Sequence, residues 1–305
     1  MPFLQLTVDL GATDPEAFES ACFETGAVSV TLSDAADSPI LEPAPGVTPL
    51  WPSVRLSALF AGERQGAEVA ASIASIVGAP FPPHHFERVA DREWEREWLK
   101  DFHPMRFGTR LWVCPNAEPP PDRQATVVWL DPGLAFGTGT HPSTALCLEW
   151  LDAAELNSLD VIDYGCGSGI LAIAAVKLGA ASVAAVDIDP QASIATDRNA
   201  LRNGVGDRIV TGTPEARLEP ADVLLANILF QPLLELAPRF ASLVRPGGHV
   251  VLAGILTSQV ETVTAAYRPW FDIQPFRTRN EWVCLHGYRV CLIGHLQNRR
   301  DSHRR

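Results

Sequence analysis

The chain has 305 residues, a length that allows two domains, each with a core of its own. Its 24 Lys and Arg against 36 Asp and Glu give a formal net charge of −12, which argues against a nucleic acid as a broadly docked partner, because phosphate binding needs a basic face. The 47% hydrophobic and 20% charged content is ordinary for a soluble globular protein, and the N-terminal segment lacks the basic start and long apolar run of a signal peptide.

The first 92 residues predict a small α+β domain. A helix is expected to start at Asp14, with Pro15 in its first position. The stretch 33–52, rich in Pro, Ala and acids, is expected to be a surface loop. The order of elements is β-α-β-β-α-β, which is that of a ferredoxin-like domain. These elements are expected over 3–10, 14–25, 27–32, 54–60, 66–77 and 84–89.

A charged segment, 93–106, is predicted to be a linker helix that leads into a second domain. Trp94 and Trp98 are four residues apart, so they share one face of such a helix. We interpret them as docking the linker on a neighbouring domain rather than as gripping a substrate.

The second domain is expected over 107–293. Its loop 131–144 is rich in glycine and hydroxyl residues, and it is longer than a helix cap requires. Loops of this kind often cover a bound ligand. We therefore expect Phe136, Gly137 and Thr138 to be among the residues that contact a cofactor.

The stretch from Asp163 to Gly169 has the pattern D-x-G-x-G-x-G and joins an apolar strand to an apolar helix. Glycines allow a positive φ and bring the backbone against a ligand, and the helix start offers free N–H groups. A dinucleotide site needs G-x-G-x-x-G, but the sixth position counted from Gly165 is Ile170. The pattern is instead typical of S-adenosylmethionine (SAM) sites, which makes Asp163, Gly165 and Gly167 candidate cofactor contacts. On its own it also fits an ordinary strand-to-helix turn.

An acid at the end of the next strand supports the cofactor interpretation. Asp187 closes the strand expected over 182–188, about 20 residues after the glycines, where an acid accepts both ribose hydroxyls. Asp189 has a different task, because Asp189-Pro190 has the form of an N-cap followed by proline in the first helical position.

Helices and strands then alternate, and two antiparallel strands close the domain. This is the layout of a class I SAM-dependent methyltransferase, an α/β fold with a Rossmann-like parallel sheet and an antiparallel C-terminal hairpin.

The apolar window 169–187 is interrupted by Lys177 and Gly179, so it predicts a helix and a strand rather than a membrane span. The polar stretch 294–305 is expected to be a disordered tail. Further helices are expected over 191–203, 232–244 and 259–270, a turn over 245–248, and strands over 208–211, 222–226, 250–255, 271–277 and 281–290.

Several motifs in both domains match one known pattern, so the chain resembles the bacterial ribosomal protein L11 methyltransferase (PrmA) family. The likeness covers most of the chain, and the Phe-Gly-Thr-Gly-Thr-His-Pro loop is its most specific part. The motifs are W-E-R-E-W at 94–98, F-H-P-M-R-F-G at 102–108, the loop 131–144, the glycine stretch 163–171, D-I-D-P at 187–190, A-N-I-L at 226–229 and E-W at 281–282.

The resemblance implies that residues 1–92 recognise a ribosomal protein and that the catalytic domain methylates amino groups, both on lysine side chains and on an α-amine. It also implies SAM as the cofactor. Carried onto this sequence, the cofactor contacts of the family fall on Thr144, Gly165, Asp187 and Asn227, and the pattern is intact at all four.

Asn227 is the candidate catalytic residue. The acceptor amine must be neutral, although the pKa of a free lysine is about 10.4, and desolvation beside the cationic sulfonium lowers that pKa. The carboxamide oxygen of Asn227 can accept an N–H of the amine and orient its lone pair, whereas the alternative role is that of a turn residue at a strand end. The Ile-Leu after Asn227 disfavours glutamine and adenine as acceptors. His141 is a candidate general base, but a structural role in its loop fits it better.

Two alternatives remain open: a methyltransferase that acts on another basic protein or a small amine, and a noncatalytic SAM-binding or RNA-associated scaffold. The intact motifs count against the scaffold, and the acidic charge balance counts against RNA.

Six cysteines without a C-x-x-C pair predict neither a zinc site nor a disulfide framework. We therefore expect a cytoplasmic monomer whose substrate is a basic ribosomal protein, without direct contact to nucleic acid or membrane and without a metal.

Overall fold

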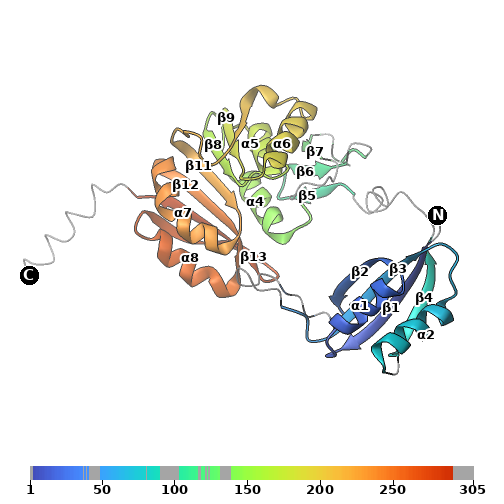
Figure 1. The fold of residues 1–305 in the computed structure, drawn as a ribbon. Helices are drawn as coiled ribbons and strands as arrows, with labels where there is room; N and C mark the ends of the chain where they lie inside the picture. Colours follow the sequence, from blue (N-terminus) through green and yellow to red (C-terminus); the bar gives the residue numbers. More distant parts are fainter. Residues whose placement is uncertain are drawn as a thin grey trace, which may run out of the picture. The chain divides into compact units, whose positions relative to one another are not determined.

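The computed structural model describes residues 3–36, 38, 40, 49–79, 81–89, 103–115, 118–120, 122, 124–130 and 139–290. The chain divides into two compact units, Met1–Glu97 and Trp98–Arg305, each with a sheet and a core of its own (Figure 1). The boundary lies inside the segment expected to be a linker.

The described part of the first unit has the predicted ferredoxin-like order. Its four strands pair in the order β2-β3-β1-β4, and every neighbouring pair is antiparallel. The helix α1 begins slightly later than predicted, because Pro15 is its N-cap and the Asp14 carboxylate accepts the N–H of Glu16 at 3.1 Å. The elements are β1 (Phe3–Gly11), α1 (Glu16–Glu24), β2 (Ala27–Asp34), β3 (Val54–Ala61), α2 (Gly66–Val77) and β4 (His84–Val89).

The core of this unit lies between the helices and one face of the sheet. In β1 every second side chain is buried, as expected of a strand with one covered face. Leu6 of β1 and Phe60 of β3 pack there with Phe18 of α1 and Ile73 of α2.

Residues 139–290 of the second unit form a seven-stranded sheet in the order β10-β9-β8-β11-β12-β14-β13. The strands from β10 to β12 are parallel, and β14 is antiparallel to both of its neighbours. These findings confirm the predicted parallel sheet with its antiparallel hairpin. The strands are β8 (Asp160–Tyr164), β9 (Ser182–Val186), β10 (Ile209–Gly212), β11 (Ala221–Asn227), β12 (Val244–Leu256), β13 (Phe271–Arg279) and β14 (Trp282–Arg289).

The strand order reverses between β8 and β11. From β8 the chain proceeds outward to β9 and β10, and it then returns to β11 on the other side of β8. In open α/β sheets, ligands bind outside the carboxyl ends of the strands at such a switch point. The topology alone therefore directs attention to the residues that follow β8, β9 and β11.

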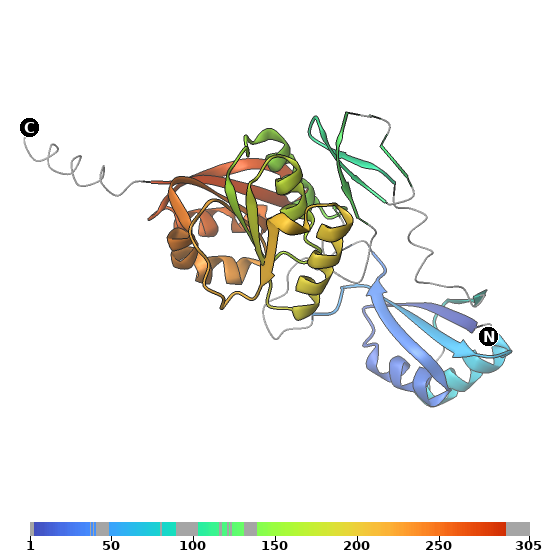
Figure 2. The same ribbon diagram turned by 90° about the horizontal axis from the view of Figure 1, so that it is seen from above.

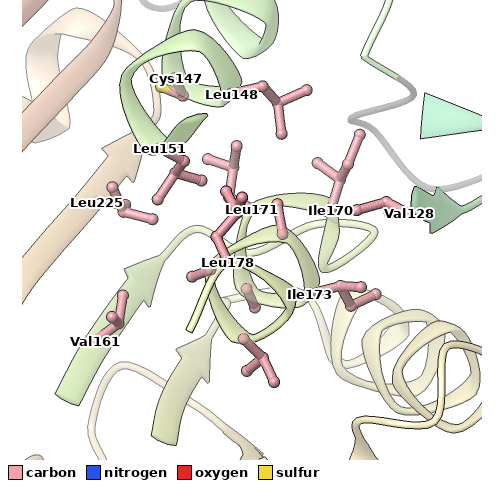
Figure 3. Packing of buried hydrophobic residues seen from close by; sticks show 14 of the residues in the cluster. Val128, Cys147, Leu148, Leu151, Val161, Ile170, Leu171, Ile173, Leu178 and Leu225 are labelled. Atoms are coloured by element: carbon pink, nitrogen blue, oxygen red, sulfur yellow. The ribbon is translucent and has the colours of Figure 1, made fainter. Parts of the chain in front are cut away.

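Helices cover both faces of this sheet (Figures 1 and 2). One core holds residues of α4 and α5 against the sheet (Figure 3). Residues 170–176 of α5 are all buried. The other core holds residues of α7 and α8. Among the described residues, no helix is long and apolar enough to cross a membrane. The helices are α4 (Pro142–Ala153), α5 (Ile170–Lys177), α6 (Pro190–Arg202), α7 (Phe230–Leu243) and α8 (Val260–Tyr267).

A small sheet of β5 (Met105–Phe107), β6 (Leu111–Cys114) and β7 (Thr126–Trp129) precedes the large one. It corrects the expected linker helix, because Met105 and Arg106 pair with β6 as strand residues. The helical part of that prediction, 93–102, lies outside the described residues.

Strand β12 begins earlier than predicted, at Val244, but residues 245–248, where a turn is expected, have no partner in the register with β11 or β14, and Gly247 has a φ of 79°. Val244 pairs with Ala221 of β11, and the register shifts before the next pair. The Arg245 guanidinium bonds to the carboxylates of Asp222 at 2.7 Å and Asp160 at 2.8 Å. These two ion pairs join Arg245, at the start of this irregular segment, to β11 and β8.

A pair of histidines joins β12 to β14 near the amino end of β12. Nδ1 of His249 lies 2.9 Å from Nε2 of His286, and the two ring planes are within 12° of each other. The ring of Trp150 packs on both imidazoles. Burial and the neighbouring His249 imidazole lower the pKa of His286 to about 4, and burial also lowers the pKa of His249.

This pair is expected to make the protein less stable at mildly acidic pH. The unfolded chain protonates His286 near the ordinary pKa of 6.5, whereas the folded protein resists protonation until about 4, so stability falls as the pH drops from 7 toward 4. Between pH 7.5 and 5.0 we expect a loss of about 1–2 kcal/mol, a figure reduced for the partial exposure of the ring. Urea unfolding at both pH values measures it. His286→Gln should flatten the dependence, whereas His85→Gln on β4 should not; an unchanged dependence in His286→Gln would contradict the assignment.

Candidate cofactor and catalytic site

Strand register brings three of the predicted residues to one edge of the sheet. Tyr164 at the end of β8 pairs with Val186 of β9 on one side and with Ala226 of β11 on the other. The residue that follows each of these three is a predicted site residue, namely Gly165, Asp187 and Asn227. The three candidates therefore lie side by side at the carboxyl edge, at the switch point.

The glycine turn after β8 needs its glycines. Gly165, Gly167 and Gly169 have φ values of 85°, 54° and 78°, in the left-handed region. A Cβ added to Gly165 would lie 2.3 Å from Cγ2 of Ile228. The Gly165 N–H donates to the carbonyl of Val186 at 2.7 Å, which ties the turn to β9. A side chain at Gly165 would therefore be disfavoured twice, by the left-handed φ of the backbone and by the contact with Ile228.

The two acids after β9 have separate partners. One carboxylate oxygen of Asp187 accepts the N–H of Gly167 at 2.9 Å, and the other accepts the N–H of Asp189 at 3.0 Å. The Asp189 carboxylate caps α6 by accepting the N–H of Gln191 at 2.9 Å, and Pro190 is the first residue of that helix. The predicted cap is confirmed. Asp187 is joined directly to the glycine turn, with its carboxylate orientation fixed by two backbone donors.

Asp163 is fully buried beneath the turn. Its Oδ2 accepts the N–H of Ala172 in the first turn of α5 at 3.0 Å, and its Oδ1 has no hydrogen-bond partner among the described residues. Burial raises the pKa of Asp163 to about 7, and the nearby Asp187 carboxylate adds to the shift. The side chain thus ties β8 to the start of α5 and leaves one buried acceptor oxygen at the site.

Asn227 and Thr144 are in direct contact. The carboxamide nitrogen of Asn227, the last residue of β11, donates to Oγ1 of Thr144 at 3.1 Å. Thr144 is the third residue of α4 and is buried. A hydrogen bond therefore links two predicted residues that are far apart in the sequence.

His141 caps the helix that carries Thr144. Its Nδ1 accepts the N–H of Ser143 at 3.3 Å and lies 2.7 Å from the Ser143 hydroxyl oxygen. The ring of Trp282 packs against the imidazole with centroids 4.6 Å apart. Burial lowers the pKa of His141, which favours the neutral ring that a cap acceptor requires. These contacts fit the structural role expected of His141.

Gly254 of β12 is a residue of this edge that the sequence did not single out. Its φ is 79°, and an added Cβ would lie 2.3 Å from the carbonyl oxygen of Ile228, directly after Asn227. It lies where the register between β12 and β14 shifts. An isolated glycine inside a strand is the available signal, because such a residue often marks a bulge or a close backbone approach.

Phe136, Gly137 and Thr138, which were also predicted to contact the cofactor, lie outside the described residues. Gly139, the first described residue after them, has a φ of 87°. A Cβ there would lie 3.4 Å from both Ile170 and Phe107. The end of this loop is thus closely packed beside the start of α5.

Known proteins are similar to this chain along nearly its whole length. The model of the family described as ribosomal protein L11 methyltransferase (PrmA) matches residues 2–290. A ribosomal protein L11 methyltransferase of Cellvibrio japonicus (strain Ueda107) is 49% identical over 287 residues, which cover 93% of this chain and 98% of the relative. One of Pseudomonas aeruginosa (strain LESB58) is 50% identical over 291 residues, covering 95% and 99%.

A solved structure agrees with these relatives. The crystal structure of ribosomal protein L11 methylase from Lactobacillus delbrueckii subsp. bulgaricus is similar to this chain with a TM-score of 0.57 and 34% identity. The similarity covers 62% of this chain and 100% of that one. The family model and the two relatives lead to one conclusion: the chain belongs to the ribosomal protein L11 methyltransferase (PrmA) family.

Proposed function

We propose that the protein transfers methyl groups from SAM to amino groups of ribosomal protein L11, both on lysine side chains and on an α-amine. The observation that carries the proposal is the alignment of Gly165, Asp187 and Asn227 at one sheet edge in a chain of this family. Gly165 and Asp187 are proposed to contact the cofactor, and Asn227 is proposed to contact the acceptor amine.

The described residues at this edge fit SAM. The Asp187 carboxylate suits the two ribose hydroxyls, and the glycine turn lets the backbone approach a ligand closely. The buried Oδ1 of Asp163, without a partner among the described residues, is an acceptor suited to a cationic amino-acid group. Bound there, SAM supplies a methyl group on a positively charged sulfur.

The chain's own task is to prepare the acceptor amine. Asn227 stands at the end of β11, beside the glycine turn, where its carboxamide oxygen can accept an N–H and hold the lone pair in line. An amine has a free lone pair only when it is neutral. Removal of the amine from water favours this neutral form. No proton acceptor on the protein is required, because the proton of the methylated amine can leave to water.

The first unit is proposed to bind the ribosomal protein. It is a separate unit with its own core, and its described strands form a sheet of their own rather than part of the sheet that carries Asn227. The formal net charge of −12 would steer a basic protein toward the enzyme.

One experiment tests both parts of this proposal. The full chain is incubated with methyl-labelled SAM and ribosomal proteins from cells that lack this activity, and label is expected in L11. A variant without residues 1–92 is expected to keep its SAM affinity, measured by calorimetry, and to lose the labelling of L11. Label in a different protein would refute the substrate, and full labelling of L11 by the shortened variant would refute the role of the first unit.

A further inference from the structure

We propose that Thr144 is a positioning residue, whose hydroxyl holds the carboxamide of Asn227 so that the carboxamide oxygen is presented to the acceptor amine. The inference rests on the proposed amine methyltransferase function and assigns a task within it. It differs from the cofactor contact that the family resemblance implies for Thr144.

The contact itself sets the orientation of the carboxamide. Nδ2 of Asn227 donates to Oγ1 of Thr144 at 3.1 Å. The nitrogen and oxygen of the Asn227 carboxamide point to opposite sides of the Cβ–Cγ bond. A hydrogen bond from Nδ2 to Thr144 therefore turns Oδ1 away from Thr144. Rotation by half a turn would exchange the two atoms with almost no change of shape. A hydrogen-bond partner is needed to select one orientation, and the Thr144 hydroxyl, which can both donate and accept, is the acceptor for Nδ2 in this structure.

The chemistry requires that selection. With Oδ1 toward the acceptor, Asn227 accepts an N–H of the amine and leaves the nitrogen lone pair available. With Nδ2 toward the acceptor, the carboxamide would donate a proton to that same lone pair, which must instead attack the methyl group. The wrong orientation would thus suppress the nucleophile while leaving the cofactor in place.

Thr144 is itself held firmly. It is 3% exposed and lies in the first turn of α4. The cap at His141 fixes this turn, and Trp282 of β14 packs against the capping ring. A β-branched side chain in a helix also has few rotamers. The hydroxyl is therefore a fixed reference point for the more freely rotating carboxamide.

Two substitutions separate the hydroxyl from the shape of the side chain. Thr144→Val has nearly the same volume without the oxygen, and it is expected to lower kcat about tenfold, as the loss of one orienting hydrogen bond does. The Kd for SAM should stay within about threefold of wild type, because the effect acts on the acceptor. Thr144→Ser keeps a hydroxyl and should recover most of the lost kcat. Activity is measured as methyl transfer to L11.

A double-mutant cycle decides whether Thr144 acts through Asn227. Asn227→Ala alone is expected to lower kcat about 100-fold. Adding Thr144→Val to it should cause no further loss, because the group that Thr144 orients is gone. Thermal unfolding establishes that each variant is folded, and Thr144→Ala replaces Thr144→Val in the cycle if the valine variant is not.

Two results would overturn the proposal. If the losses in kcat multiply in the double variant, Thr144 acts independently of Asn227. If Thr144→Val weakens SAM binding while kcat at saturating SAM is unchanged, Thr144 is a cofactor contact only. Failure of the proposed function would look different, since the wild-type protein itself would then leave L11 unmethylated.

Discussion

Replacing Asp187 with alanine is expected to raise the Kd for SAM by at least about 100-fold, while the protein remains folded. The carboxylate accepts N–H groups from Gly167 and Asp189, so it is fixed in place before any ligand arrives. Two charge-assisted hydrogen bonds to ribose hydroxyls contribute roughly 1.5–3 kcal/mol each, and their loss corresponds to at least this change in Kd. Isothermal titration calorimetry with SAM measures it directly.

Asp189→Ala is the matched control. It removes a carboxylate only two residues further along, whose observed partner is the N–H of Gln191 in the first turn of α6. The loss of this cap should cost about 1 kcal/mol of stability and leave the Kd for SAM within about threefold of wild type. Normal SAM affinity in Asp187→Ala, or equal losses in both variants, would show that the ribose assignment is wrong.

The helix cap at Asp189 and the position of Asp187 directly after β9 could be predicted from the sequence because local patterns define both. Asp189 precedes a proline at a helix start, and Asp187 ends an apolar strand at a known distance from the glycines. The order of helices and strands was predictable for the same reason. Alternation of apolar residues and capping patterns depend on neighbours within a few positions.

Contacts between distant segments were not predictable in this way. Thr144 and Asn227 are 83 residues apart, and their hydrogen bond depends on how α4 packs beside β11. The ion pairs from Arg245 to Asp222 of β11 and Asp160 of β8 are a second example, because they join three strands that are distant in the sequence. In both cases the contact depends on how distant segments pack, which local sequence patterns do not define.

Gly254→Ala is expected to damage both stability and catalysis. A Cβ at this position would lie 2.3 Å from the carbonyl oxygen of Ile228 and 3.0 Å from its carbonyl carbon. These are backbone atoms, so β12 or the segment after Asn227 must move. The φ of 79° adds strain of about 1–2 kcal/mol for any residue with a Cβ. Together we expect a loss of roughly 3–5 kcal/mol in the free energy of unfolding.

The same displacement reaches the proposed catalytic residue. Ile228 follows Asn227 directly, so a shift of its carbonyl moves the carboxamide relative to the acceptor. A displacement of about 1 Å can cost up to about 100-fold in rate, and we expect kcat in Gly254→Ala to fall at least about tenfold. Methyl transfer to L11 at a temperature where the variant is folded measures this separately from stability.

Gly247→Ala separates the steric contact from the backbone strain. Gly247 lies in the same strand and has the same φ of 79°, but an added Cβ there meets nothing within 4 Å. It should therefore lose only about 1–2 kcal/mol of stability and keep its kcat. If Gly254→Ala is no less stable and no less active than Gly247→Ala, the close approach of β12 to Ile228 does not shape the site. If it is impaired in both respects, this single glycine sets the position of the segment that carries Asn227.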